Sequence, residues 1–179
     1  FRTGKYGNTS GPGIHEGILY HGCRDGIFYA ISLDGKEIWR FVAGPNSISI
    51  VPLFHNGRIY FGSGDGNVYC LGIDGKEVWR FRTEGCVWSN PVLWEGERGK
   101  EIYFGSWDCH IYCVDPDTGK EIWRFVTSTK TKSPLPPPYD AYEVTIKKSV
   151  EESKEKEGEK YKSTAVRVDI GSEYSVKSE

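Results

Sequence analysis

The sequence repeats one short motif, Glu-x-Trp-Arg-Phe, three times along its 179 residues. The copies lie at residues 37–41, 77–81 and 121–125, so their tryptophans are 40 and 44 residues apart. A period of about 40 residues is typical of arrays of small β-units, above all of four-stranded propeller blades. We therefore expect an all-β protein, a β-propeller of which about three four-stranded blades are present, followed by a C-terminal β-hairpin region.

Each copy predicts four short strands separated by turns. In the second copy the expected strands are residues 50–54, 59–62, 67–72 and 77–82. Asn56-Gly57 is the dipeptide of a tight hairpin, and Asp74-Gly75 supplies residues that tolerate a positive φ. The β-branched and aromatic residues between these turns favour strands.

The repeat also predicts how the chain is divided. We expect residues 1–10 to be the last strand of a preceding blade, and residues 11–43, 44–85 and 86–128 to be one blade each. Residues 129–179 are expected to be a Pro-rich connection and a charged β-hairpin tail, as an insertion in the next blade or the start of another domain. Propellers typically close with about four to eight blades. The chain is therefore expected to be part of a longer protein, or to complete its ring with a second copy.

Composition argues against two classes of partner. The formal net charge is −2, and acidic and basic residues are intermixed, which gives no electrostatic footprint for nucleic acid or an anionic membrane. No run approaches the roughly 18 apolar residues of a membrane-spanning helix. The absence of Met and Gln beside abundant Lys and Glu suggests a thermophilic source. The sequence leaves the cellular compartment open.

The repeated tryptophans, Trp39, Trp79 and Trp123, are expected to be structural. Alternation along a strand directs each Trp to one face and the following Arg to the other. A Trp at a fixed place in every blade is suited to packing against the next blade, where it buries on the order of 200 Å². We predict that these three residues dock blade to blade.

No catalytic, cofactor-binding or metal site is expected in the repeats. The turn aspartates recur once per copy and are expected to shape turns. Cys109-His110-x-x-Cys113 resembles a ligand cluster, but positions four apart in a strand lie about 13 Å apart, too far for one zinc ion. Function is expected where the copies differ. Four such residues are candidate partner-binding residues: Trp88, Trp94, Trp107 and Arg24.

The stretch 112–123 resembles the tryptophan-docking motif A-x-D-x-x-T-G-x-x-x-W of the pyrroloquinoline-quinone (PQQ) dehydrogenases. The resemblance covers roughly residues 11–127 and implies a PQQ-like propeller repeat protein, closer to the non-enzymatic lipoprotein of the BAM outer-membrane assembly machinery than to true quinoproteins. The dehydrogenases hold their quinone beside a disulfide of adjacent cysteines, and this sequence has no adjacent Cys pair. The resemblance therefore assigns no catalytic residue and no cofactor to this chain.

These observations favour a non-enzymatic scaffold that binds protein or peptide partners. The alternative is a quinone-dependent dehydrogenase, or another propeller that binds a small molecule, whose active site lies in blades outside this chain. A second alternative is an extracellular or sensor domain of a signalling protein.

Overall fold

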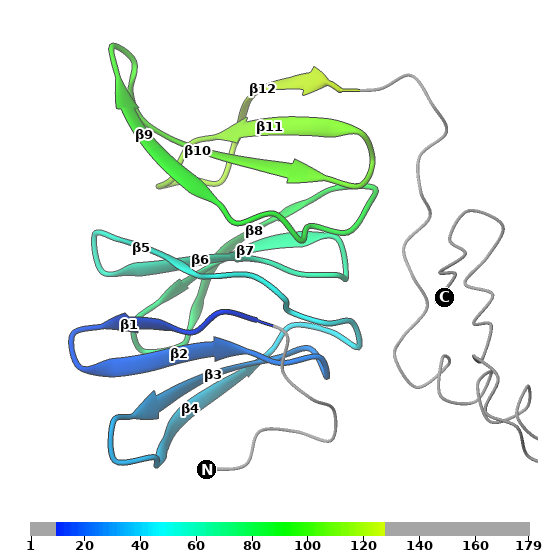
Figure 1. Ribbon diagram of the computed structural model, residues 1–179. Coiled ribbons are helices and arrows are strands. Elements are labelled where there is room, and N and C mark those ends of the chain that lie inside the picture. Colours follow the sequence, from blue (N-terminus) through cyan, green and yellow to red (C-terminus); the bar gives the residue numbers. More distant parts are fainter. Residues whose placement is uncertain (1–9, 128–179) are drawn as a thin grey trace, which may run out of the picture. The chain divides into compact units, whose positions relative to one another are not determined.

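The computed structural model describes residues 10–127, which form three four-stranded antiparallel sheets and contain no helix (Figure 1). Each sheet is a meander of strands consecutive in sequence. The first sheet contains β1 (Gly13–His15), β2 (Ile18–Gly22), β3 (Ile27–Ser32) and β4 (Glu37–Val42). The second contains β5 (Leu53–His55), β6 (Arg58–Gly62), β7 (Asn67–Gly72) and β8 (Glu77–Arg82). The third contains β9 (Val92–Gly96), β10 (Gly99–Ser106), β11 (His110–Val114) and β12 (Glu121–Val126).

The predicted all-β class with three blade-like sheets is confirmed. The expected strands 67–72 and 77–82 coincide with β7 and β8, whereas the expected strand 50–54 begins later, at Leu53. Pro52 has no N–H to give to a ladder, and Val51 N donates to the side chain of Asn90 at 2.8 Å. The expected strand in residues 1–10 and the expected hairpin in 129–179 lie outside the described residues, apart from Ser10.

The tight turns follow the predicted backbone chemistry. Asn56 and Gly57 have φ of 49° and 68°, which is the left-handed pair of a two-residue hairpin, and His55 pairs with Arg58 across it. Gly75 also has a positive φ, of 81°. The sequence therefore sets the ends of these strands through residues that accept φ above zero.

Two hydrophobic clusters join the three sheets. The first contains Phe28 of the first sheet and Phe61 of the second, whose parallel rings are 4.2 Å apart. The second contains Val68 of the second sheet and Phe104 of the third. The core therefore lies between neighbouring sheets, as expected when each repeat buries its apolar surface against the next.

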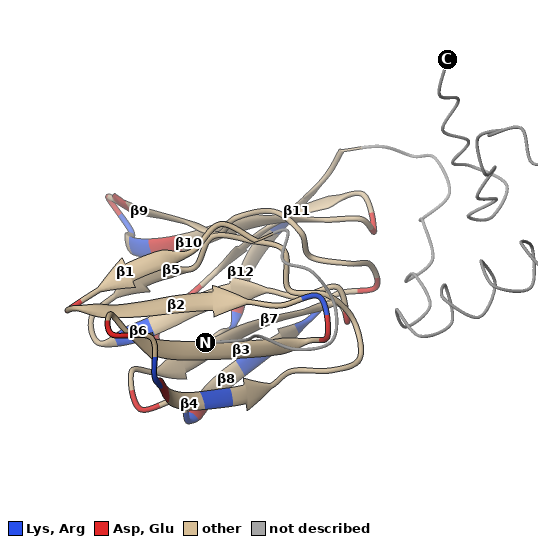
Figure 2. Cartoon of the chain, turned by 60° about the horizontal axis from the view of Figure 1, so that its bottom comes forward, with Lys and Arg blue, Asp and Glu red and all other residues tan. Residues whose placement is uncertain are grey.

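The outer strands carry charge on their exposed face. Arg40 is bound by Glu37 through two hydrogen bonds and lies over the ring of Tyr29, and the second and third sheets repeat this arrangement. Figure 2 shows basic patches on β4 and β8 among acidic turns. Residues 10–127 contain no helix long and apolar enough to cross a membrane.

Candidate partner-binding rim

One end of the three sheets is formed by turns and connections that we call the turn rim, on the right in Figure 1. It consists of the second turn of each sheet (residues 23–26, 63–66 and 106–109) and the connections between sheets (residues 43–52 and 83–91). Three of the four candidate residues lie on it: Arg24, Trp88 and Trp107.

Backbone hydrogen bonds hold the rim in place. Each connection returns to the turn of its own sheet: Ile48 N donates to Cys23 O, and Val87 N to Ser63 O, both at 3.0 Å. Each also binds the turn of the following sheet: Gly64 N donates to Ser47 O, and Trp107 N to Cys86 O, both at 2.9 Å. A side chain on this rim therefore projects from a backbone fixed on two sides.

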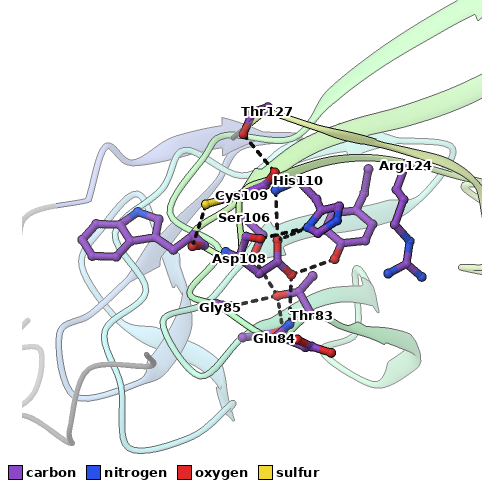
Figure 3. Close-up of polar contacts among 12 residues, drawn as sticks. Thr83, Glu84, Gly85, Ser106, Asp108, Cys109, His110, Arg124 and Thr127 are labelled. Atoms are coloured by element: carbon purple, nitrogen blue, oxygen red, sulfur yellow. Dashed lines mark hydrogen bonds and ion pairs between the residues drawn. The ribbon is translucent and has the colours of Figure 1, made fainter. Parts of the chain in front are cut away.

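The recurring turn aspartates cap the turns. Asp25, Asp65 and Asp108 each accept a hydrogen bond from the backbone N–H two residues later. Figure 3 shows Asp108 at the centre of the rim turn of the third sheet, where it also accepts a hydrogen bond from Glu84 N at 3.0 Å. Its side chain is buried and receives the hydroxyl of Tyr112 at 2.7 Å. Burial, and then the bond to Asp108, raise the pKa of Tyr112 well above its usual value.

The described residues contain no group of three or more His, Cys, Asp or Glu side chains that could hold a metal ion. None of the five cysteines is joined in a disulfide within the described residues, and Cys109 alone among them is partly exposed. Burial raises the pKa of Cys70 to about 11 and that of Cys86 to about 12. Buried thiols with raised pKa values are poor nucleophiles at neutral pH.

Trp88 and Trp107 meet on the rim. Their ring centroids are 4.7 Å apart and their planes are nearly perpendicular, at 79°. Trp88 Nε1 donates to Ser47 O at 3.4 Å, and the indole lies over Gly64, where an added Cβ would come within 2.8 Å of Nε1. Both indoles are partly exposed. Edge-to-face contact and the absence of a side chain at residue 64 together fix the orientation of this pair.

Arg24, Gly64 and Trp107 occupy the same position of the three rim turns, directly before the capping aspartate. The rim therefore presents a cation on the first sheet, Trp88 over the glycine of the second, and Trp107 on the third. Sequence reasoning singled out Trp88 and Trp107 separately and missed Gly64. The sequence did contain a signal for Gly64, because the equivalent positions of the other copies carry the large side chains of Arg24 and Trp107.

Trp94 lies apart from the rim. It is on β9 near the hairpin to β10, at the opposite end of the third sheet, and is 62% exposed. It lines a cavity of about 310 Å³ together with Glu101 and Tyr103. The four candidate residues therefore do not form one site.

Two of the three repeated tryptophans contact the neighbouring sheet through a main-chain acceptor and a glycine. Trp39 Nε1 donates to Ile73 O at 2.9 Å, and Trp79 Nε1 donates to Pro116 O at 3.0 Å. A Cβ added to Gly75 would lie 2.7 Å from Trp39, and one added to Gly119 would lie 2.6 Å from Trp79. Trp123 packs against Tyr103 of its own sheet, and no residue in the described range 10–127 accepts from its indole. The two glycines are positions that sequence reasoning used only as turn formers.

Repeated four-stranded meanders that pack face to face through a Trp on the outer strand define a propeller-type repeat protein. Residues 24–136 match the family model described as outer membrane protein assembly factor BamB. The chain belongs to this family and is a PQQ-like β-propeller protein.

Solved structures show the same fold. BamB from Moraxella catarrhalis superposes with a TM-score of 0.53 at 23% identity, over 66% of this chain and 36% of that one. Quinohemoprotein alcohol dehydrogenase from Comamonas testosteroni gives 0.55 at 25% identity, over 67% of this chain and 21% of that one. A europium-containing methanol dehydrogenase superposes with a TM-score of 0.55 at 18% identity, over 70% of this chain and 32% of that one. The chain thus spans about a third or less of these proteins, and no curated protein sequence matches it.

Proposed function

We propose that this chain is a non-enzymatic PQQ-like scaffold that binds a protein or peptide partner at the turn rim, with Trp88 and Trp107 as the anchor. The observation that carries the proposal is their perpendicular contact at 4.7 Å on a rim fixed by backbone hydrogen bonds. Rigid, partly exposed aromatic pairs lose little conformational entropy on binding and are enriched among residues that dominate interface energy.

The chemistry of the rim indicates the kind of partner. Two indoles offer an apolar contact surface, and Arg24 adds a positive charge in the equivalent turn of the first sheet. An extended segment with an apolar or aromatic side chain and a nearby carboxylate complements these groups. The family description, which concerns assembly of outer membrane proteins, supports a protein partner over a small molecule.

A displayed random peptide library provides the test. The immobilised full chain selects peptides, and fluorescence anisotropy then measures the affinity of the synthetic versions. Trp88→Ala is expected to weaken binding at least ~10-fold, which is the loss of a contact of about 1.4 kcal/mol. Trp94→Ala removes an exposed indole from the opposite end and serves as the matched control. Peptides that bind Trp88→Ala as well as the natural chain, or no enrichment at all, contradict the proposal.

A quinone-dependent enzyme is the second candidate, favoured by the 25% identity to the quinohemoprotein alcohol dehydrogenase. In that case, blades beyond this chain supply the catalytic groups. Titration of the longer protein with pyrroloquinoline quinone and Ca²⁺, followed by Trp fluorescence, separates the two candidates. Saturable quenching together with dye-linked alcohol oxidation would support the enzyme and reject the scaffold.

A further inference from the structure

The turn rim carries a cation at its first-sheet end. The rim turn 23–26 contains Arg24, whose side chain is partly exposed. The neighbouring carboxylate, Asp25, accepts a hydrogen bond from Ile27 N at 3.2 Å and so caps its own turn. The connection 43–52 that follows contains no charged residue. Arg24 is therefore the cation that this end of the rim offers to a partner.

The end of the rim at the third sheet is acidic. Residues 83–91 and 106–109 contain two carboxylates, those of Glu84 and Asp108, and no Lys or Arg. Glu84 N donates to Asp108 Oδ2 at 3.0 Å, which holds the exposed Glu84 beside the turn that carries Trp107 (Figure 3). Carboxylates beside an indole favour a cationic side chain, through their charge and through the face of the ring.

The second sheet, between these two ends, is balanced in charge. Its rim turn contains Asp65, and Arg82 Nη1 donates to the main-chain carbonyl of that residue. Trp88 lies over Gly64 here, so the middle of the rim offers an apolar surface. Packed sheets lie about 10 Å apart, so the first and third rim turns are about 20 Å apart, a distance that about six residues of an extended segment span.

We propose that the partner of the turn rim is an extended segment with oppositely charged ends. A carboxylate meets Arg24, a Lys or Arg side chain about six residues away meets Trp107 and Glu84, and an apolar side chain between them lies on Trp88. The proposal rests on the proposed function and adds the charge pattern of the partner to it. Complementary charges fix the register and reject segments whose ends carry the wrong sign, whereas the apolar contact is common to all of them.

Three displayed peptide libraries test this charge pattern on the immobilised full chain. Every peptide has five random residues between two fixed ends, which are one Asp and one Lys in either order, two Asp, or two Lys. The three libraries are mixed in equal amounts, and sequencing counts the peptides that the chain retains. The natural chain is expected to enrich the mixed-charge library at least ~10-fold over each of the others.

Charge reversal at either end of the rim is expected to change the preferred library. Arg24→Glu makes both ends acidic and is expected to move the enrichment to the two-Lys library. Glu84→Arg replaces the exposed carboxylate by a cation and is expected to move it to the two-Asp library. The double variant exchanges the two signs and is expected to favour the mixed library again. Circular dichroism checks that each variant is folded.

Two further variants serve as controls. Trp88→Ala is expected to abolish the enrichment of all three libraries. Lys36→Glu changes the charge by as much as Arg24→Glu, but at an exposed residue in the last turn of the first sheet, at the opposite end, and is expected to leave the preference unchanged. Equal enrichment of the three libraries that still depends on Trp88 would overturn the charge pattern and leave the proposed function standing. No enrichment of any library would overturn both.

Discussion

Gly75→Ala is expected to destabilise the protein because Gly75 lies directly beneath Trp39. The residue has a φ of 81°, and an added Cβ would come within 2.7 Å of the indole. The left-handed backbone costs about 1–2 kcal/mol for a residue with a Cβ. Crowding of a packed ring adds about 1–3 kcal/mol. The two terms give a loss of about 2–5 kcal/mol in the free energy of unfolding.

Gly57→Ala is the matched control for the backbone term. Gly57 has a φ of 68°, and nothing lies within 4 Å of the Cβ it would gain. Its replacement is expected to cost only the backbone term, about 1–2 kcal/mol. Urea unfolding monitored by circular dichroism compares the two variants, provided that the dependence of free energy on urea is unchanged.

A double-mutant cycle separates the ring contact from other effects of the substitution. Trp39→Leu keeps an apolar side chain but removes the ring atoms that the new Cβ meets. In that background Gly75→Ala is expected to cost about as much as Gly57→Ala, with a coupling energy of about 1–3 kcal/mol between residues 39 and 75. Equal losses for Gly57→Ala and Gly75→Ala, or no coupling to Trp39, would refute the close packing of indole and turn.

Three further predictions concern the buried hydroxyls, the thiols and the charge pair. Burial first, and for Tyr69 and Tyr112 also a bond to an aspartate, raise the pKa of three buried tyrosines, so the folded state holds these protons more tightly. Stability is therefore fully present below pH 10 and falls above it, by up to about 1.4 kcal/mol per pH unit for each tyrosine, measurable by urea unfolding at rising pH. Alkylation at pH 8 is expected to label the partly exposed Cys109 quickly and the four buried cysteines only after unfolding. Mass spectrometry counts the labelled cysteines. Arg58→Ala is expected to lose about 1–3 kcal/mol through its carbonyl bonds, against about 0.5 kcal/mol for Asp117→Ala, whose side chain is 68% exposed; similar losses would mean that the exposed ion pair dominates.

The repeat predicts the strands well because strand ends depend on local chemistry. Asn56-Gly57 and the alternation along residues 77–82 fix a turn and a strand through the residues themselves. The sequence was less informative about the third copy, whose last turn, residues 115–120, is longer than the equivalent residues 73–76 and is capped by a different aspartate. Asp115 accepts bonds from Asp117 N, Thr118 N and Thr118 Oγ1, whereas Asp117 reaches Arg58 of the second sheet. Alignment of the three copies by sequence puts Asp117, and not Asp115, in the capping position.

Contacts between sheets were less accessible to sequence reasoning. Trp88 meets Trp107 because the neighbouring turn has a glycine at residue 64, a condition set by a different copy of the repeat. Contacts of this kind depend on how the neighbouring sheets are aligned in space.

The acceptor for the Trp39 indole is the main-chain carbonyl of Ile73 in a short turn, and the acceptor for the Trp79 indole is that of Pro116 in a longer one. A contact to the backbone does not depend on the side chain at that position, and it tolerates a change of turn length as long as a glycine follows beneath the ring. These turns are therefore sites where insertions and sequence drift can accumulate while the sheets stay joined. Loops with new binding properties could be grafted there without redesigning the interface.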